Sequence, residues 1–260
     1  PMKKAVSIRA VIPNVITIIA LSLGLTAIKF TLEQNFYYAV ICVVLAAVLD
    51  AADGRIARLI KGTSKFGAEL DSLADFVNFG VAPALIVYIW ELNTYGNIGW
   101  LVTLIFIICC CLRLARFNVL SESPKSPLLD NFFTGVPSPA GAGILLLPVI
   151  VSLSHFSYLL NKMENLSLCV MLFSSFLMVS KIPTYAFKKF KITKPLVLLV
   201  MIISVVLFGF LVNYTFETLF VIGLLYLCLI PVSFFHYKAI KKKHSLKTRS
   251  DESLFSEDVL

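Results

Sequence analysis

The sequence DAADGRIARLIKGTSKFGAELDSLAD, residues 50–75, places four aspartates between long apolar segments. Asp50 and Asp53 are three residues apart, and Asp71 and Asp75 are four apart. At these spacings the side chains of each pair share one face of a helix. Charged groups within apolar spans are costly and by default indicate a functional site. The pattern therefore predicts two neighbouring helices that bring four carboxylates together.

Four clustered carboxylates cannot all stay ionised unless a positive charge lies among them. Carboxylate oxygens suit hard divalent cations, so the cluster predicts a Mg²⁺ or Mn²⁺ site. The alternative is ordinary solvated aspartates at helix ends, paired with Arg55, Arg58 or Lys65. Gly54 and Gly67 disfavour it, because a glycine within a helix costs about 1 kcal/mol relative to alanine and indicates close approach by a ligand or another backbone.

The composition is that of a membrane protein. Of the 260 residues 58% are hydrophobic, and the mean hydropathy is +0.89. A membrane span needs about 20 apolar residues, and these apolar runs are continuous, without the alternation of a β-barrel. We therefore expect an all-α polytopic membrane protein with about eight transmembrane helices, the sixth bent at Pro183. The predicted spans cover approximately residues 11–30, 36–60, 68–90, 100–117, 133–153, 166–187, 195–212 and 216–237.

The net charge of +8 would also suit a nucleic-acid-binding protein, but its distribution follows membrane topology. Of the 23 lysines and arginines, only Lys29 and Lys162 fall on one face of the predicted membrane. By the positive-inside rule both termini and the aspartates are cytoplasmic, and no nucleic-acid partner is expected. The six cysteines lie within apolar runs without metal-ligand spacing, so we interpret them as apolar fillers.

Two further polar pairs share helix faces. Arg113 and Arg116, three residues apart near the end of a span, could clamp a carboxylate or a phosphate. Positive-inside anchoring is the alternative. Asn14 and Thr17 could line a polar interior, with helix capping or interhelical hydrogen bonding as the alternative.

The spacing DxxDGxxAR-x8-GxxxDxxxD, beginning at Asp50, resembles the signature of the CDP-alcohol phosphatidyltransferases and is complete at every position. The segment IPNVIT (12–17) is similar to the first helix of that family. The segments RLARFN (113–118) and FTGVPSPA (133–140) resemble its phosphatidylserine synthase branch. The resemblance covers about residues 12–147.

The resemblance implies roles for the aspartates. Asp50, Asp53 and Asp71 would hold one divalent cation, and Asp50, Asp71 and Asp75 a second. Asp75 would also be the general base that activates the acceptor hydroxyl.

The resemblance also implies the substrate-binding residues. CDP would be bound by Asn14, Thr17, Asp53, Gly54, Ala57, Arg58 and Gly67. The serine acceptor would be bound by Arg113, Arg116 and Asn118.

The activity implied is transfer of the phosphatidyl group from CDP-diacylglycerol to the hydroxyl of L-serine, with release of CMP. Residues 1–190 would form the catalytic core of about six helices, residues 191–237 an additional helix pair, and residues 238–260 a charged, disordered tail. We expect a homodimer in the bilayer of a bacterial inner membrane, with its active site facing the cytoplasm.

Two alternatives remain open at this stage. A sister enzyme could use glycerol phosphate or inositol phosphate as the acceptor, because arginines bind phosphate as well as carboxylate. A cation transporter could also use an acidic site. Against the transporter, the aspartates lie at one membrane face, and the paired broken half-spans of transporters are not evident.

Overall fold

The computed structural model describes residues 8–60, 64–121, 132–158, 165–180, 182–185, 194–234 and 237. Within these residues five helices are long and apolar enough to cross a membrane, and three shorter helices are also apolar. The helical membrane architecture is thus confirmed, whereas the exact number of spans and the orientation of the termini stay predictions. The predicted tail, residues 238–260, lies outside the described residues.

The elements follow in chain order. They are α1 (Ile8–Leu32), α2 (Phe36–Leu59), α3 (Lys65–Asp75), the π-helical turn η1 (Phe76–Val81), α4 (Ala82–Trp90), the 3-10 turn η2 (Leu92–Tyr95), α5 (Asn97–Ser121), β1 (Phe132–Thr134), α6 (Ser138–Leu153), α7 (Leu166–Val179), β2 (Pro183–Tyr185), α8 (Lys194–Asn213) and a last helix, Thr215–Phe234. The run α3–η1–α4 forms one continuous helix, Lys65–Trp90.

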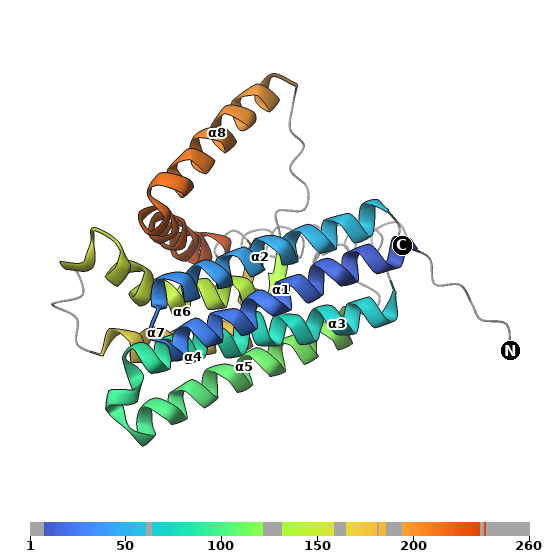
Figure 1. Ribbon diagram of the computed structural model, residues 1–260. Helices are drawn as coiled ribbons and strands as arrows, with labels where there is room; N and C mark the ends of the chain where they lie inside the picture. Colours follow the sequence, from blue (N-terminus) through green and yellow to red (C-terminus); the bar gives the residue numbers. More distant parts are fainter. Residues whose placement is uncertain are drawn as a thin grey trace, which may run out of the picture.

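The bundle is built around α1 and α2, which pack along each other (Figure 1). The continuous helix α3–η1–α4 packs against α1, and α5 packs against α7. The side chains of Phe79, Phe106 and Met171 are completely buried in the core. Alanines such as Ala27 and Ala39 are also fully buried, and small residues let membrane helices approach closely. By contrast, α8 leans away from the bundle in Figure 1.

Helix α6 begins after a tight connection at Gly135. This glycine has a φ of +84°, and a Cβ there would lie 2.8 Å from the carbonyl oxygen of Ser180. Both the backbone conformation and the space therefore require glycine. Pro137 caps the helix, which is short, as the sequence predicts.

The sixth predicted span ends earlier than expected. Helix α7 stops at Val179 instead of residue 187, and Pro183 starts strand β2 instead of bending a helix. Strand β2 pairs antiparallel with β1, with Phe132 opposite Tyr185. The first position of a strand tolerates proline. The all-helical prediction thus missed this small two-stranded sheet.

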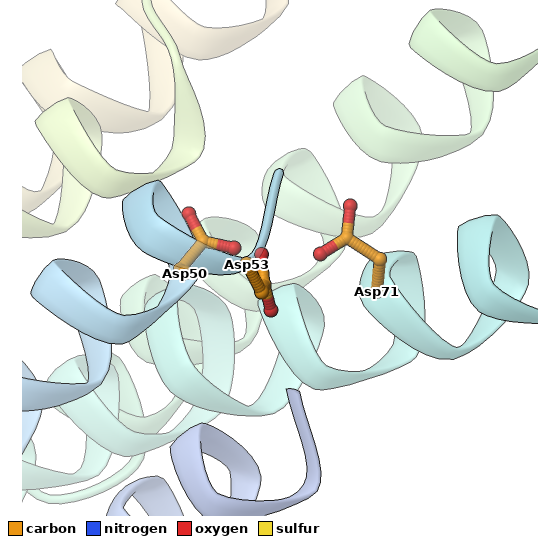
Figure 2. A group of neighbouring side chains, drawn as sticks. All are labelled: Asp50, Asp53 and Asp71. Carbon is orange, nitrogen blue, oxygen red and sulfur yellow. The ribbon is translucent and has the colours of Figure 1, made fainter. Parts of the chain in front are cut away.

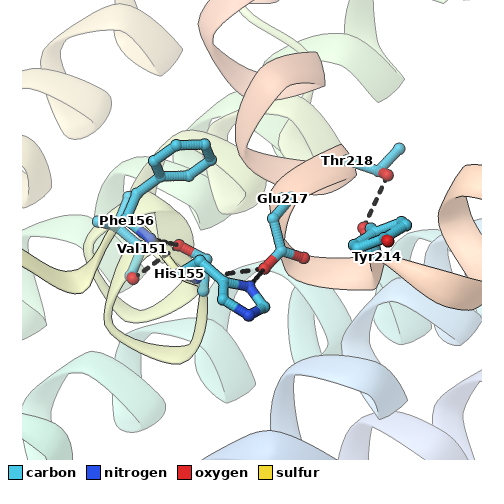
Figure 3. A network of polar contacts seen from close by, with 7 residues as sticks. Val151, His155, Phe156, Tyr214, Glu217 and Thr218 are labelled. Carbon is cyan, nitrogen blue, oxygen red and sulfur yellow. Dashed lines mark hydrogen bonds and ion pairs between the residues drawn. The ribbon is translucent and has the colours of Figure 1, made fainter.

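The last helix is held to the bundle at its start. The rings of Phe216 and Tyr37 lie 5.1 Å apart, which joins this helix to α2. Nδ1 of His155, just after α6, lies 2.5 Å from Oε1 of Glu217 (Figure 3). These contacts fix the last helix beside α6, a position that matters for the polar cluster described below.

Candidate metal and nucleotide site

Helix α3 begins with Ser64 as its N-cap residue. The hydroxyl of Ser64 accepts a hydrogen bond from the backbone N–H of Gly67 at 2.9 Å. Such an N-cap contributes about 1 kcal/mol to helix stability. A Cβ on Gly67 would lie 2.7 Å from Oδ1 of Asn14, so α3 approaches α1 more closely than alanine would allow. The close packing of α3 against α1 therefore requires a glycine at position 67.

Three of the four predicted aspartates converge (Figure 2). Asp50 and Asp53 project from α2 toward Asp71 on α3, and one carboxylate oxygen of each lies within 4.8 Å of the others. Asp53 is only 3% exposed. The helical spacing of the sequence therefore does bring these carboxylates together. Asp75 lies outside this group of three.

Thr17 fixes the orientation of one carboxylate. Its buried hydroxyl lies 2.7 Å from Oδ2 of Asp53 and 3.0 Å from the carbonyl oxygen of Pro13, and it can donate its proton to only one of them at a time. The interhelical hydrogen bond that the sequence left as an alternative is thus present. It links the Asp53 carboxylate of α2 to α1.

Among the described residues, no basic side chain forms an ion pair with these three aspartates. In the part of the chain that the structure describes, ion pairs occur only at Lys29–Glu33 and His155–Glu217. Pairing of the aspartates with Arg55, Arg58 or Lys65 is therefore not observed. Clustered, partly buried carboxylates need a positive partner, and an all-oxygen donor set matches Mg²⁺ or Mn²⁺. The residues fit a divalent cation.

A pocket of about 250 Å³ opens beside the three aspartates. It is lined by Pro13, Asn14, Thr17, Asp53, Gly54, Ala57, Arg58, Ser64, Gly67, Ala68 and Asp71. A Cβ on Gly54 would meet nothing within 4 Å, so this backbone faces open space. Nε of Arg58 donates to the carbonyl oxygen of Gly54 at 2.9 Å, which folds the guanidinium back along the pocket wall. All seven residues predicted to bind CDP line this one pocket.

Replacement of Gly54 by leucine is expected to fill part of this pocket. Steric overfilling costs about 1–3 kcal/mol, so the KM for a nucleotide substrate should rise roughly tenfold or more. Steady-state kinetics of Gly54→Leu would measure it. The matched control is Gly209→Leu, because Gly209 lies on α8 and a Cβ there also meets nothing within 4 Å. Equal KM values for both variants would contradict a nucleotide site at Gly54.

Asp75 ends α3 and precedes the π-helical turn η1. Its Oδ1 is buried and has no hydrogen-bond partner among the described residues. The rest of its carboxyl group lies within hydrogen-bonding reach of the Asp50 carboxyl group, and Asp71 and Arg113 are within electrostatic range. One turn later, the side chain of Asn78 is 1% exposed and packs directly against the backbone of Gly24 on α1, where a larger residue would leave no room for it. Because π-helical turns are frequent at functional sites, η1 fits a role in directing Asp75 toward the cluster.

The three residues predicted to bind the acceptor lie in different surroundings. Arg113 donates from Nη1 to the hydroxyl of buried Ser138, and Arg116 donates to the carbonyl oxygen of Val179 at 3.2 Å. The amide of Asn118 contacts the Ser72 hydroxyl, with its nitrogen at 3.0 Å and its oxygen at 3.1 Å. Arg113 therefore contacts the start of α6, Arg116 contacts the end of α7, and Asn118 joins α5 to α3.

Sequence reasoning missed several residues that position the site. Ser64 could have been found from its place three residues before Gly67, a typical capping distance. Ser72 lies between two aspartates of the motif, but its partner on α5 is 46 residues away. Ser138 lies within a segment that the sequence singled out, yet nothing local indicates its contact with Arg113.

Comparison with known proteins supports the residue pattern. The model of the CDP-alcohol phosphatidyltransferase family matches residues 10–180. The chain is similar to proteins named CDP-diacylglycerol–serine O-phosphatidyltransferase: it is 46% identical over 133 residues to that of Mycobacterium tuberculosis (51% of this chain and 46% of the relative), 40% identical over 190 residues to that of Helicobacter pylori (73% and 78%), and 41% identical over 178 residues to that of Bacillus subtilis (68% and 92%).

The matched part of the chain spans about half the length of the mycobacterial relatives and most of the other two. The family match includes α1, the aspartate helices α2 and α3, and the arginines of α5. It ends near the close of α7, before α8 and the last helix. Because the match covers well over half of the sequence and includes every residue of the aspartate site, the chain belongs to the CDP-alcohol phosphatidyltransferase family.

Proposed function

We propose that this protein is a phosphatidylserine synthase, which transfers the phosphatidyl group of CDP-diacylglycerol to the hydroxyl of L-serine and releases CMP. The observation that carries the proposal is the cluster of Asp50, Asp53 and Asp71, two of which line a pocket. Asp75, which is half-buried, follows one helical turn after Asp71. The serine acceptor is supported by the names of the relatives. It is also supported by Arg113, whose fork suits a carboxylate.

In this proposal the nucleotide occupies the pocket between α1, α2 and α3. Gly54 offers open backbone against which a flat base can lie, and Arg58 places a cation near the diphosphate. Asp50, Asp53 and Asp71 would hold a divalent cation. When bound, such cations would neutralise the charge on the phosphate oxygens and stabilise the leaving group. We propose two ions, the second held by Asp50, Asp71 and Asp75.

The chemistry is a displacement at the phosphorus that carries diacylglycerol. The serine oxygen forms a bond to phosphorus, the bond from phosphorus to the CMP oxygen breaks, and the hydroxyl proton moves to Asp75. The buried Oδ1 of Asp75 has no partner among the described residues, so it can accept that proton. Asp75 lies one helical turn from Asp71, which keeps base and phosphate site adjacent.

The proposed setting is an inner membrane, with eight spans, cytoplasmic termini and a cytoplasmic active site. The charge distribution supports it, because nearly all lysines and arginines lie at the face of the aspartates. We also propose a homodimer with a catalytic core at residues 1–190, an added helix pair at residues 191–237 and a tail at residues 238–260. Mass measurement in lipid nanodiscs would determine the oligomeric state.

The proposal is tested by CMP release from CDP-diacylglycerol by the purified protein with Mn²⁺. Parallel reactions would contain L-serine, glycerol 3-phosphate, inositol phosphate or no acceptor. We expect release to depend on L-serine and to stop when the metal is chelated. Preference for a phosphorylated acceptor would assign a sister activity, and no release with any acceptor would contradict the enzyme proposal in favour of a transporter.

Replacement of Arg113 by lysine is expected to raise the KM for L-serine about tenfold, with little change for CDP-diacylglycerol. Lysine keeps the charge but loses the planar fork that binds a carboxylate with two hydrogen bonds. We expect a smaller effect of Arg116→Lys, since lysine can still donate to the Val179 carbonyl. The control is Arg55→Lys at an exposed position of α2. An equal rise in both KM values would place Arg113 on the phosphates.

A further inference from the structure

The last helix, Thr215–Phe234, lies beyond the residues matched by the family model, yet one of its faces is built into the bundle. Gly223, Tyr226, Ile230 and Ser233 recur at spacings of three and four, so they share this face. A Cβ on Gly223 would clash with the side chain of Leu147, so the helix backbone lies directly against α6. Ile230 and Ser233 are buried. The face is packed against protein, not lipid.

Tyr226 brings a polar group to the centre of this face. Its ring packs against the buried cluster of Val136, Ile144, Leu177 and Ile230, which surrounds the start of α6. Its hydroxyl oxygen is buried and has no hydrogen-bond partner among the described residues. A buried phenol normally finds a partner, so this unpaired hydroxyl calls for an explanation.

The unpaired hydroxyl belongs to a larger polar cluster around Arg113. Tyr226 and Asp75 both lie within electrostatic range of the Arg113 guanidinium group. Nη1 of Arg113 donates a hydrogen bond to Ser138. The Nε of Arg113 is buried and has no hydrogen-bond partner among the described residues. Three helices thus bring Tyr226 and Asp75 within electrostatic range of the Arg113 guanidinium group, and the hydroxyl of Tyr226, Nε of Arg113 and Oδ1 of Asp75 each have no hydrogen-bond partner in the described part of the chain.

The chemistry of these atoms matches one kind of ligand. Arginine Nε–H and tyrosine O–H are donors, and both suit a carboxylate. The carboxylate of Asp75 is an acceptor that suits a hydroxyl. A site made to bind a substrate leaves its buried polar groups unpaired when that substrate is absent. A small molecule with a carboxylate at one end and a hydroxyl at the other would satisfy all three groups.

We propose that Tyr226, on the last helix, completes the acceptor site by binding the carboxylate of serine together with Arg113, so that the serine hydroxyl faces Asp75. This inference rests on the proposed phosphatidylserine synthase activity. It gives the last helix a role in substrate selection. Ser138 then holds the guanidinium of Arg113 in place, as a positioning residue.

The test is the variant Tyr226→Phe, which keeps the packed ring and removes only the hydroxyl. Loss of a hydrogen bond to a charged group should raise the KM for L-serine about tenfold to a hundredfold. The KM for CDP-diacylglycerol and the thermal midpoint of unfolding should stay unchanged. The matched control is Tyr214→Phe, because Tyr214 is exposed just before the same helix, and its kinetics should equal those of the wild type.

The outcomes separate this inference from the proposed function. If the wild-type protein makes no phosphatidylserine, the proposed function fails and the inference fails with it. If the wild type makes it but Tyr226→Phe leaves the KM for L-serine unchanged, raises both KM values equally or prevents folding, the hydroxyl has no role in serine binding and the inference alone is overturned. A matching rise in KM for glycerol 3-phosphate as acceptor would assign Tyr226 to anions in general and overturn carboxylate selection.

Discussion

Asp71→Asn is expected to reduce CMP release by roughly a thousandfold or more, the largest effect of any single substitution in the site. Within the group of Asp50, Asp53 and Asp71, only Asp71 comes from α3, and in the proposed site it is a ligand of both cations. Charge stabilisation by a bound divalent cation is worth several kcal/mol, and each 1.36 kcal/mol is tenfold in rate. Asp50→Asn and Asp53→Asn should have effects of the same order.

The measurement is CMP release at saturating Mn²⁺, combined with Mn²⁺ binding followed by electron paramagnetic resonance. Asp71→Asn should lose both activity and high-affinity Mn²⁺ binding while staying folded in the membrane. The control is Glu69→Gln, an exposed carboxylate two residues earlier on the same helix. Near-normal turnover of Asp71→Asn with saturating metal would remove it from the set of metal ligands.

Asp75→Asn is expected to lose most of its kcat and to keep CDP-diacylglycerol binding. Asparagine preserves the shape and one carbonyl oxygen but cannot take a proton from serine. Assistance by a general base is worth about 10²–10⁴-fold. The Asp75 carboxyl group meets Asp50 through one oxygen, whereas its buried Oδ1 has no hydrogen-bond partner among the described residues and is the atom that we expect to take the proton.

Binding to Asp75→Asn should be measured separately from turnover, as metal-dependent protection by CDP-diacylglycerol against thermal unfolding. Asp50→Asn serves as the comparison, since it should lose that protection. If Asp75→Asn loses protection as completely as Asp50→Asn, Asp75 acts chiefly as a metal ligand. If Asp75→Asn turns over at nearly the wild-type rate, the base lies elsewhere.

Features encoded by local spacing could be predicted from the sequence. The apolar runs located most of the helices, and the aspartate spacing located the aspartate cluster, because both depend on helical periodicity. The interhelical bond of Thr17 to Asp53 was foreseen only as an alternative, since hydroxyls of membrane helices often bond to their own backbone as well. The spacing of the motif could not show which three of the four aspartates would approach one another most closely.

Features that depend on distant contacts could not be predicted. Strand β2 exists because residues 132–134 pair with it, so a hydropathy pattern alone extended the sixth span through Pro183. The close contact of Asn78 with Gly24 joins segments more than 50 positions apart. The hydroxyl of Tyr226 meets the surroundings of Arg113 only once the last helix docks on α6.

The most direct test of phosphatidyl transfer at this site uses L-serine labelled with ¹⁸O in its hydroxyl group. The purified protein would be given CDP-diacylglycerol, Mn²⁺ and the labelled serine, and both products would be analysed by mass spectrometry. Attack by the serine hydroxyl predicts equal amounts of CMP and phosphatidylserine, with the label in the oxygen that joins serine to phosphorus and none in CMP. Release of CMP without labelled phosphatidylserine, or equal product after chelation of the metal, would contradict the proposed reaction.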